Sequence, residues 1–174
     1  LSAGGVTVGV LGCGIDIVYP PEHKDLMQRV LQKGAVITEY PPGTPPNGYH
    51  FPKRNRIISG LCQAVCVVEG DLKSGSLITA RHALYQGKDL YAVPGRIGEA
   101  GAAGPNTLIK NGARAVTTPT DILKNYEFLY PHTIRMAAID AALAAPYSPD
   151  DATDVAVRMN VSAKNGNKYY GGGL

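Results

Sequence analysis

The sequence predicts an α/β protein in which helices cover both faces of a parallel sheet. Two observations support this prediction. Short apolar segments rich in Val, Ile and Ala alternate with segments of helical periodicity along the 174 residues, which is the pattern of right-handed βαβ units. The apolar segments are also nearly continuous, as in strands that are buried on both faces. Ligands bind beyond the carboxyl ends of the strands in such sheets, so we expect the functional residues there.

The first half of the chain predicts two strands and two helices. Pro20 and Pro21 favour the start of a helix, Leu26 and Val30 lie on its apolar face, and Gly34 is its expected end. A loop rich in Pro and Gly follows, and a loop of this length in a compact domain is more often functional than idle. In chain order we expect a strand over 6–11, a helix over 22–33, a strand over 35–38, a loop over 41–52 and a short helix over 54–62.

The second half continues the alternation. Gly87 is expected to close a helix, and Pro94 with Gly95 to stop a strand. The Gly- and Ala-rich segment that follows is expected to be a loop. In chain order we expect a strand over 64–68, a helix over 77–86, a strand over 90–93, a short helix over 106–111 and a strand over 113–116.

We assign residues 1–130 to one partial domain and residues 131–174 to a helical tail. The tail predicts a helix over 132–144 and a second helix from Ser148. This pattern is compatible with the opening of a truncated winged-helix module.

Composition excludes several classes of protein. No run of about 18 apolar residues is present, so we expect no membrane span. The net charge of +3 is too small to indicate a nucleic-acid binder by itself, so any basic site must be local. Cys13, Cys62 and Cys66 lie in apolar segments, as buried thiols do in a reducing cytoplasm. The four histidines are scattered, and we expect neither a metal nor a cofactor.

A basic segment at the start of the predicted 54–62 helix is the most informative motif. Its cations could bind phosphates, because such contacts release counterions, and the amides of a helix start would add to the attraction. The aromatic ring could stack on a base. The alternative is a solvated basic face with the ring as a loop anchor. The DNA-contact candidates are Phe51, Lys53, Arg54, Asn55 and Arg56, and we expect Arg54 and Arg56 to be exposed.

A second candidate lies between the 64–68 strand and the next helix. Ser74, Gly75 and Ser76 could bind an anion through hydroxyl and amide groups at the helix start, with Lys73 and Arg81 beside them. The alternative is an ordinary serine cap. Together with the basic segment, these residues would form the second wall of a phosphate-binding groove.

Two further features are weaker. Gly12-Cys13-Gly14 follows the first strand, but a Gly-x-Gly pair alone is poor evidence of a dinucleotide site, and the glycines could simply make a tight turn. Glu69 ends a predicted strand, but no nucleophile or base accompanies it at a telling spacing. We therefore predict no catalytic residues, and expect Glu69 to orient a neighbouring group.

With these residues in view, the chain resembles the DprA/Smf family of DNA-processing proteins over about residues 1–125. Any one of the matching segments is modest evidence, but the set of segments in this order is highly specific to the family. They are Gly12-Cys13-Gly14 with Tyr19-Pro20; Phe51-Pro52-Lys53-Arg54-Asn55-Arg56-Ile57-Ile58-Ser59-Gly60-Leu61; Val67-Val68-Glu69 followed by Ser74-Gly75-Ser76-Leu77-Ile78-Thr79-Ala80-Arg81; Ala92-Val93-Pro94-Gly95; and Asn106-Thr107-Leu108-Ile109-Lys110-Asn111-Gly112-Ala113.

The resemblance implies a three-layer Rossmann-like domain that binds single-stranded DNA without catalysis. It further implies a cytoplasmic homodimer that protects incoming strands in natural transformation and loads the recombinase RecA onto them. Family members carry an earlier half with a Gly-Ser-Arg motif, which is missing here, so we expect a fragment, a proteolysed product or a chain whose first half is a separate polypeptide.

The alternative function is enzymatic. Nucleotide-cleaving phosphoribohydrolases are related Rossmann-like proteins, and they place a Gly-rich loop followed by Glu at the strand ends. In this chain Ser74-Gly75-Ser76 occupies the comparable loop, and Glu69 precedes it. Release of a free base from a mononucleotide would distinguish the enzyme from the binding protein.

Overall fold

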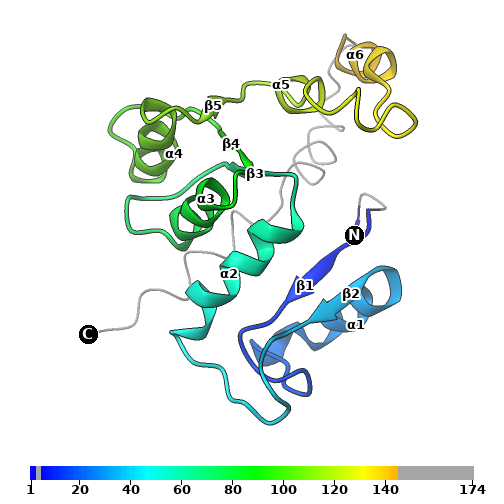
Figure 1. The fold of residues 1–174 in the computed structure, drawn as a ribbon, viewed down its shortest axis with the longest axis vertical. Helices are drawn as coiled ribbons and strands as arrows, with labels where there is room; N and C mark the ends of the chain where they lie inside the picture. Colours follow the sequence, from blue (N-terminus) through cyan, green and yellow to red (C-terminus); the bar gives the residue numbers. More distant parts are fainter. Residues whose placement is uncertain (3–4, 145–174) are drawn as a thin grey trace. The chain divides into compact units, whose positions relative to one another are not determined.

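The computed structural model describes residues 1–2 and 5–144, which form an α/β fold with parallel strands (Figure 1). The α/β class predicted from the sequence is confirmed. In order, the elements are β1 (Val8–Val10), the 3₁₀ turn η1 (Pro21–His23), α1 (Lys24–Lys33), β2 (Ala35–Ile37), α2 (His50–Leu61), β3 (Ala64–Val67), α3 (Gly75–Tyr85), β4 (Asp89–Ala92), α4 (Ala100–Lys110), β5 (Arg114–Ala115), α5 (Thr120–Leu123) and α6 (Met136–Ala144).

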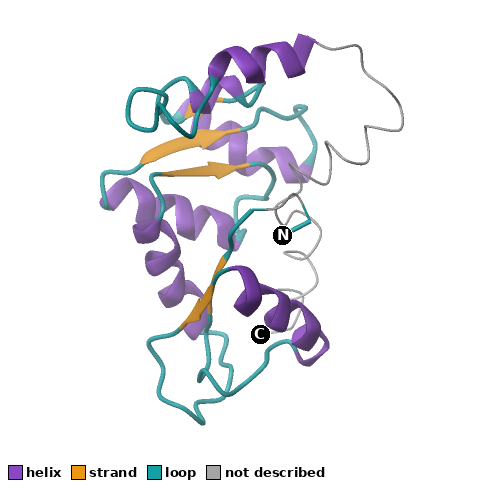
Figure 2. Cartoon of the chain, turned by 90° about the vertical axis from the view of Figure 1, so that its right-hand side faces the viewer, coloured by secondary structure: helices purple, strands orange, loops and turns teal. Residues whose placement is uncertain are grey.

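The described strands form two sheets, and every pairing in them is parallel. β1 pairs with β2, with Val8 opposite Ala35. In the other sheet β4 lies between β3 and β5, and Val67 lies opposite Ala92. Figure 2 shows β3 and β4 as neighbouring arrows that point the same way. Parallel neighbours require crossover connections, and the helices between the strands supply them.

The chain divides into two compact units. Unit 1 comprises Leu1–Gln63 and Ile78–Lys88, and unit 2 comprises Ala64–Leu77 and the residues from Asp89 onward. In unit 1, α1 packs on β1 and β2 and buries Val30. Gly34 follows α1, where the backbone passes so close to Thr7 that a Cβ would lie 1.9 Å from the Thr7 carbonyl oxygen. The chain therefore needs glycine where α1 ends and β2 begins.

The core of unit 2 surrounds a fully buried tyrosine on β4. Tyr91 is inaccessible to solvent and packs with Val116 and Tyr126. Its hydroxyl oxygen lies 3.0 Å from Asn125 Nδ2 and 3.1 Å from Arg114 Nη1, and both groups donate to it. Tyr126 in turn donates to Asp89 Oδ2 at 2.5 Å. Burial and these neighbours raise the pKa of Tyr126 above its ordinary value. The polar groups at this end of the core therefore find their hydrogen-bond partners inside the core.

The expectation of a loop before Asn106 is wrong, because helix α4 begins at Ala100. Pro105 has no amide hydrogen, so the carbonyl of Gly101 lacks its usual helical partner. That carbonyl accepts the Gly70 amide at 2.7 Å instead, and the Gly104 amide donates to Gly70 O at 2.9 Å. A Cβ on Gly104 would lie 2.5 Å from Gly70 O. The glycines thus permit close packing of a helix rather than marking a loop.

Two other helices begin four residues away from the predicted start. The helix predicted over 54–62 begins at His50, so it includes Phe51, Pro52 and Lys53 as well. The helix predicted over 132–144 begins at Met136, after a turn. The helix expected from Ser148 and the winged-helix module lie outside the described residues.

Candidate functional site

The basic segment 51–56 lies in the first half of α2, which distributes its side chains over different directions. A helix turns by about 100° per residue, so residues three apart share a face and adjacent residues do not. Lys53 and Arg56 are exposed on one face, whereas Arg54 is half-buried and Asn55 is buried. The contiguous cations of the sequence therefore do not form one contiguous patch.

Lys53 and Arg56 line a cavity of about 350 Å³ in unit 1. The wall combines two cations with an aromatic ring and a carboxylate. Its members are Glu39, Tyr40, Pro52, Lys53, Arg56 and His82. Glu39 and Tyr40 come shortly after the end of β2 at Ile37, so the cavity lies beyond the carboxyl end of a parallel strand, where ligands of such folds bind. The Arg56 guanidinium forms an ion pair with the Glu39 carboxylate.

Arg54 connects α2 to β1 instead. Its guanidinium donates to the carbonyl of Val10, the last residue of β1, and its carbon lies 5.4 Å from the centre of the Phe51 ring. The expectation that Arg54 is exposed is wrong for this reason. The carbonyl oxygen of Val10 lies where β1 meets α2, and a buried carbonyl needs a hydrogen-bond donor. Arg54 supplies that donor.

Phe51 is half-buried and contacts residues of unit 1. Its ring centre lies 5.6 Å from that of Tyr19, and its edge lies against Gly12, where a Cβ would be only 3.0 Å from Phe51 Cδ1. The ring thus anchors the turn after β1 in this structure. Stacking of Phe51 on a base remains a prediction, and it requires the ring to keep a face accessible.

Asn55 and Ser59 occupy the buried side of α2. The amide oxygen of Asn55 accepts from Arg54 Nε at 3.2 Å. Ser59 is fully buried and its hydroxyl donates to Gln86 Oε1 at 2.6 Å, while Gln86 Nε2 donates to the carbonyl of Arg56 at 2.8 Å. Gln86 therefore fixes the middle of α2, where Arg56 lies.

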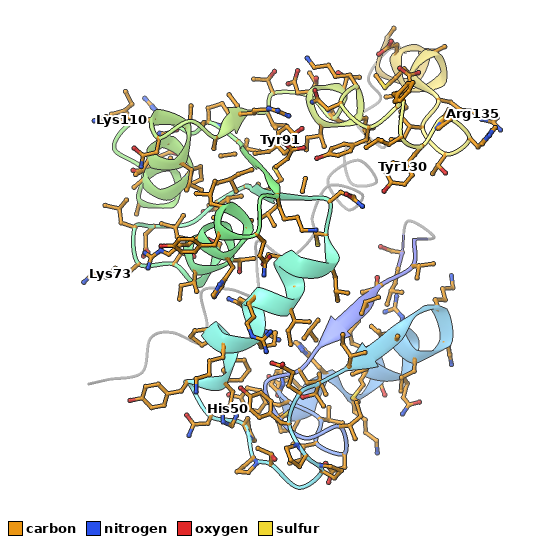
Figure 3. The ribbon with its side chains drawn as sticks, in the orientation of Figure 1. His50, Lys73, Tyr91, Lys110, Tyr130 and Arg135 are labelled. Atoms are coloured by element: carbon orange, nitrogen blue, oxygen red, sulfur yellow. The ribbon has the colours of Figure 1, made fainter. Side chains whose placement is uncertain are left out.

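His50 begins α2 (Figure 3) and fastens the helix to the turn after β1. His50 Nδ1 lies within hydrogen-bond distance, 2.9 Å, of the Gly12 carbonyl oxygen. The imidazole ring stacks on Tyr40 at a distance of 4.0 Å between ring centres. Tyr40 is thus held in the cavity wall by a residue from the start of the helix that carries Lys53 and Arg56.

The Gly-x-Gly turn after β1 is closed by another loop of the chain. Gly14 N donates to Thr44 O at 2.9 Å, and Gly43 N donates to the Asp16 carboxylate at 2.8 Å. A Cβ on Gly14 would lie 2.8 Å from the Pro41 carbonyl oxygen. The approach of the two loops therefore accounts for this glycine without a diphosphate ligand.

Ser74, Gly75 and Ser76 form the start of α3, in unit 2. The Ser76 amide donates to the Ser74 hydroxyl oxygen at 3.3 Å, and the two hydroxyl oxygens are 2.8 Å apart. This is the geometry of a serine cap, one of the two interpretations of the sequence. Anion binding by the same residues stays a prediction.

The remaining predicted cations, Lys73 and Arg81, are not among the residues that line the cavity. Lys73 precedes Ser74 and is exposed, with its side chain directed outward in Figure 3. Arg81 is exposed on α3 and belongs to unit 1. Its neighbour His82 lines the cavity, whereas Arg81 does not.

Three cavity residues outside the 51–56 motif were missed by the sequence interpretation, namely Glu39, Tyr40 and His82. A signal for the first two was present, because both directly follow a predicted strand and the carboxyl ends of strands carry the ligand contacts of this fold class. His82 has no such signal, because only the packing of α3 brings it to the cavity.

Other chemistries find little support in the part of the chain that the structure describes. Residues 1–2 and 5–144 contain no group of three or more His, Cys, Asp or Glu side chains that could hold a metal ion. No helix within those residues is long and apolar enough to cross a membrane. Cys13 is buried, and burial raises the pKa of its thiol, which makes it a poor nucleophile.

The chain matches the family described as DNA recombination-mediator protein A over residues 1–127. It is 50% identical to Protein Smf of Escherichia coli (strain K12) over 129 residues, which are 74% of this chain and 34% of that protein. It is 44% identical to the DNA processing protein DprA of Streptococcus pneumoniae over 128 residues, which are 74% of this chain and 45% of that protein. The chain thus spans less than half the length of these relatives.

Two solved structures are similar to this fold. The X-ray structure of DprA from Streptococcus pneumoniae has a TM-score of 0.64 at 43% identity and covers 70% of this chain and 43% of that one. A structure of DNA processing protein A from Helicobacter pylori, which concerns its single-stranded DNA binding mode, has a TM-score of 0.60 at 32% identity. It covers 64% of this chain and 52% of that one.

Proposed function

The chain belongs to the DNA recombination-mediator protein A family, which includes the DprA and Smf proteins, and from this premise we propose that it binds single-stranded DNA. The observation that carries the proposal is the cavity at the carboxyl end of β2. Lys53 and Arg56 stand one helical turn apart in its wall, and Tyr40 adds an aromatic ring. Cations spaced along a groove and an aromatic surface are the elements of sequence-tolerant binding to single strands.

The contacts divide between phosphates and bases. Lys53 and Arg56 bind consecutive phosphates, because a lysine ammonium acts as a point charge and an arginine guanidinium can donate two hydrogen bonds to one phosphate. Tyr40 supports a base against the wall. Phe51, Arg54 and Asn55 then contribute chiefly by holding α2 in place, while Lys73, Ser74, Gly75, Ser76 and Arg81 remain candidates for further phosphate contacts.

The wider role is a proposal that rests on membership of the family. We propose that the whole protein protects single strands and loads the recombinase RecA onto them in natural transformation and recombination. It acts in the cytoplasm as a homodimer and carries out no catalysis. The similarity of the matched region to the E. coli and S. pneumoniae proteins supports this role.

The test is fluorescence anisotropy of the 174-residue chain with a labelled oligothymidine, at several salt concentrations. For single strands the logarithm of affinity changes with the logarithm of salt concentration by about 0.7 for each phosphate contact. The Lys53→Ala/Arg56→Ala variant should bind more weakly, with a salt slope reduced in magnitude by up to about 1.4.

The matched control removes one lysine and one arginine from α1 of the same unit. Lys24 and Arg29 are exposed and do not line the cavity. The Lys24→Ala/Arg29→Ala variant should keep the wild-type salt slope. Equal losses in both variants would indicate general charge attraction, and salt-independent binding would contradict phosphate contacts altogether.

A further inference from the structure

We propose that Glu39 masks Arg56 in the free protein and that a DNA phosphate must displace it, so that this carboxylate sets the affinity of the site. This inference rests on the proposed function, because it concerns the same cavity. It assigns a task to a residue that the basic motif does not contain. Of the six described residues in the cavity wall, Glu39 is the one carboxylate.

The ion pair joins two elements of unit 1. Glu39 follows β2, and Arg56 lies 17 residues later on α2. Glu39 Oε1 contacts Arg56 Nη2, which is one of the guanidinium nitrogens that a phosphate would use. A carboxylate and a phosphate cannot both occupy that edge of the guanidinium. Binding of DNA to Arg56 through this edge therefore requires the pair to open.

The pair is placed so that it can open. The Arg56 and Glu39 side chains are 51% and 46% exposed, and ion pairs with this much solvent contact stabilise the folded state only slightly. Gln86 holds the Arg56 backbone through its carbonyl, so the guanidinium can change partner without movement of the helix. Lys53, one turn earlier in the same wall, would attract the next phosphate of the strand.

Masking makes a prediction opposite to that of a supporting role. If Glu39 competes with phosphate, its removal strengthens binding, because DNA no longer breaks an ion pair and the cavity loses a negative charge. If Glu39 instead orients Arg56 for DNA, its removal weakens binding. The sign of one substitution distinguishes the two.

The experiment compares oligothymidine binding by the wild type, Glu39→Gln, Arg56→Ala and Glu39→Gln/Arg56→Ala, with Asp25→Asn as the matched control. Asp25 is an exposed carboxylate on α1 of the same unit. We expect Glu39→Gln to bind about two- to five-fold more tightly than the wild type, the range in which an exposed ion pair can act. Its salt slope should stay close to that of the wild type, because Arg56 contacts a phosphate in both complexes.

The double variant tests the pairing itself. Glu39→Gln/Arg56→Ala should gain much less over Arg56→Ala than Glu39→Gln gains over the wild type, because only the loss of a negative charge remains once the guanidinium is gone. Masking would be overturned if Glu39→Gln bound the oligonucleotide no more tightly than the wild type does. It would also be overturned if the gain were no larger than that of Asp25→Asn. In both cases DNA binding by the wild type, and with it the proposed function, would stand. Failure of all five proteins to bind the oligonucleotide would overturn the proposed function, and masking with it.

Discussion

Arg54 and Arg56 stand two residues apart on α2 and have different partners. Two helical steps rotate a side chain by about 200°, so one arginine faces β1 and the other faces the cavity. Arg54 donates to the Val10 carbonyl and lies over the Phe51 ring, whereas Arg56 pairs with an exposed carboxylate. The first arginine contributes to the fold, and the second is available to a ligand.

This division predicts different costs for the same substitution. Arg54→Ala should reduce the free energy of unfolding by about 1 to 3 kcal/mol, because it leaves the Val10 carbonyl without a donor. Arg56→Ala should change that free energy by no more than about 0.5 kcal/mol, as exposed substitutions usually do. Urea denaturation followed by circular dichroism measures both. If Arg56→Ala lost more unfolding free energy than Arg54→Ala, the assignment of Arg54 to the fold and Arg56 to the ligand would be reversed.

At the scale of elements, the packing of α4 depends on glycines, because they let the helix come close to the backbone at Gly70. Gly104→Ala should destabilise the protein by about 1 to 3 kcal/mol, because the new Cβ meets a backbone carbonyl that cannot turn aside. The methyl group of the alanine would lie only 2.5 Å from Gly70 O unless the helix moved. The measurement is the midpoint of urea unfolding, compared with that of the wild type.

Gly60→Ala on α2 is the matched control. A Cβ there would lie 3.7 Å from Gln86 Nε2, an ordinary contact. Alanine restricts the unfolded chain more than glycine does, so this variant should gain about 0.5 to 1 kcal/mol. A gain at Gly104 as well would show that α4 can move away from Gly70.

The start of α5 depends on the ionised form of Asp121. Its carboxylate accepts the Thr117 and Thr118 amides at 2.8 and 3.0 Å, and these bonds hold the pKa at about 2. In the unfolded chain an aspartate has a pKa of about 3.9. The folded pKa is the lower one, so the stabilisation is complete above about pH 3.9 and is lost as the pH falls towards about 2.

We therefore expect Asp121→Asn to flatten the dependence of unfolding free energy on pH between about pH 4 and about pH 2. Urea denaturation over that range compares the variant with the wild type. Asp140→Asn on α6 is the control, because Asp140 is exposed and lies outside this turn. The same pH dependence in wild type and Asp121→Asn would exclude Asp121 as its source.

At the scale of the whole molecule, the two units are interleaved along the chain. Residues 1–63 form most of unit 1, but Ile78–Lys88 complete it. Ala80 and Ala83 in that segment are fully buried, and Gln86 bonds to Ser59 and to the Arg56 carbonyl. The helix that carries Lys53 and Arg56 therefore needs a segment that follows β3.

A chain of residues 1–63 should consequently lack cooperative unfolding, while a chain of residues 1–88 should retain it. Loss of Gln86 leaves the buried Ser59 hydroxyl without this partner and uncovers one face of α2. Far-UV circular dichroism during urea titration measures the difference. A cooperative transition in the shorter chain would show that Ile78–Lys88 are dispensable to unit 1.

Much of the candidate site could be predicted, but not its arrangement. The motif 51–56 contains two of the residues that line the cavity, Lys53 and Arg56, because basic residues are recognisable in a sequence by type and local spacing; their binding of phosphate stays a prediction. The directions of Arg54 and Asn55 depended on where α2 begins. That boundary was misplaced because no side chain caps the helix at Tyr49, so the usual start signal is missing.

The sequence by itself determined the α/β class, the order of strands and helices, and the glycine stops at Gly34 and Gly87, because hydrophobic periodicity and backbone restrictions act over a few residues. Only the tertiary structure decided that the segment from Ala100 is helical, since its helix is completed by hydrogen bonds to Gly70 across the fold. It also decided that Glu39 meets Arg56. That pairing depends on the packing of α2 beyond the end of β2, and such long-range contacts leave no periodic trace in the sequence.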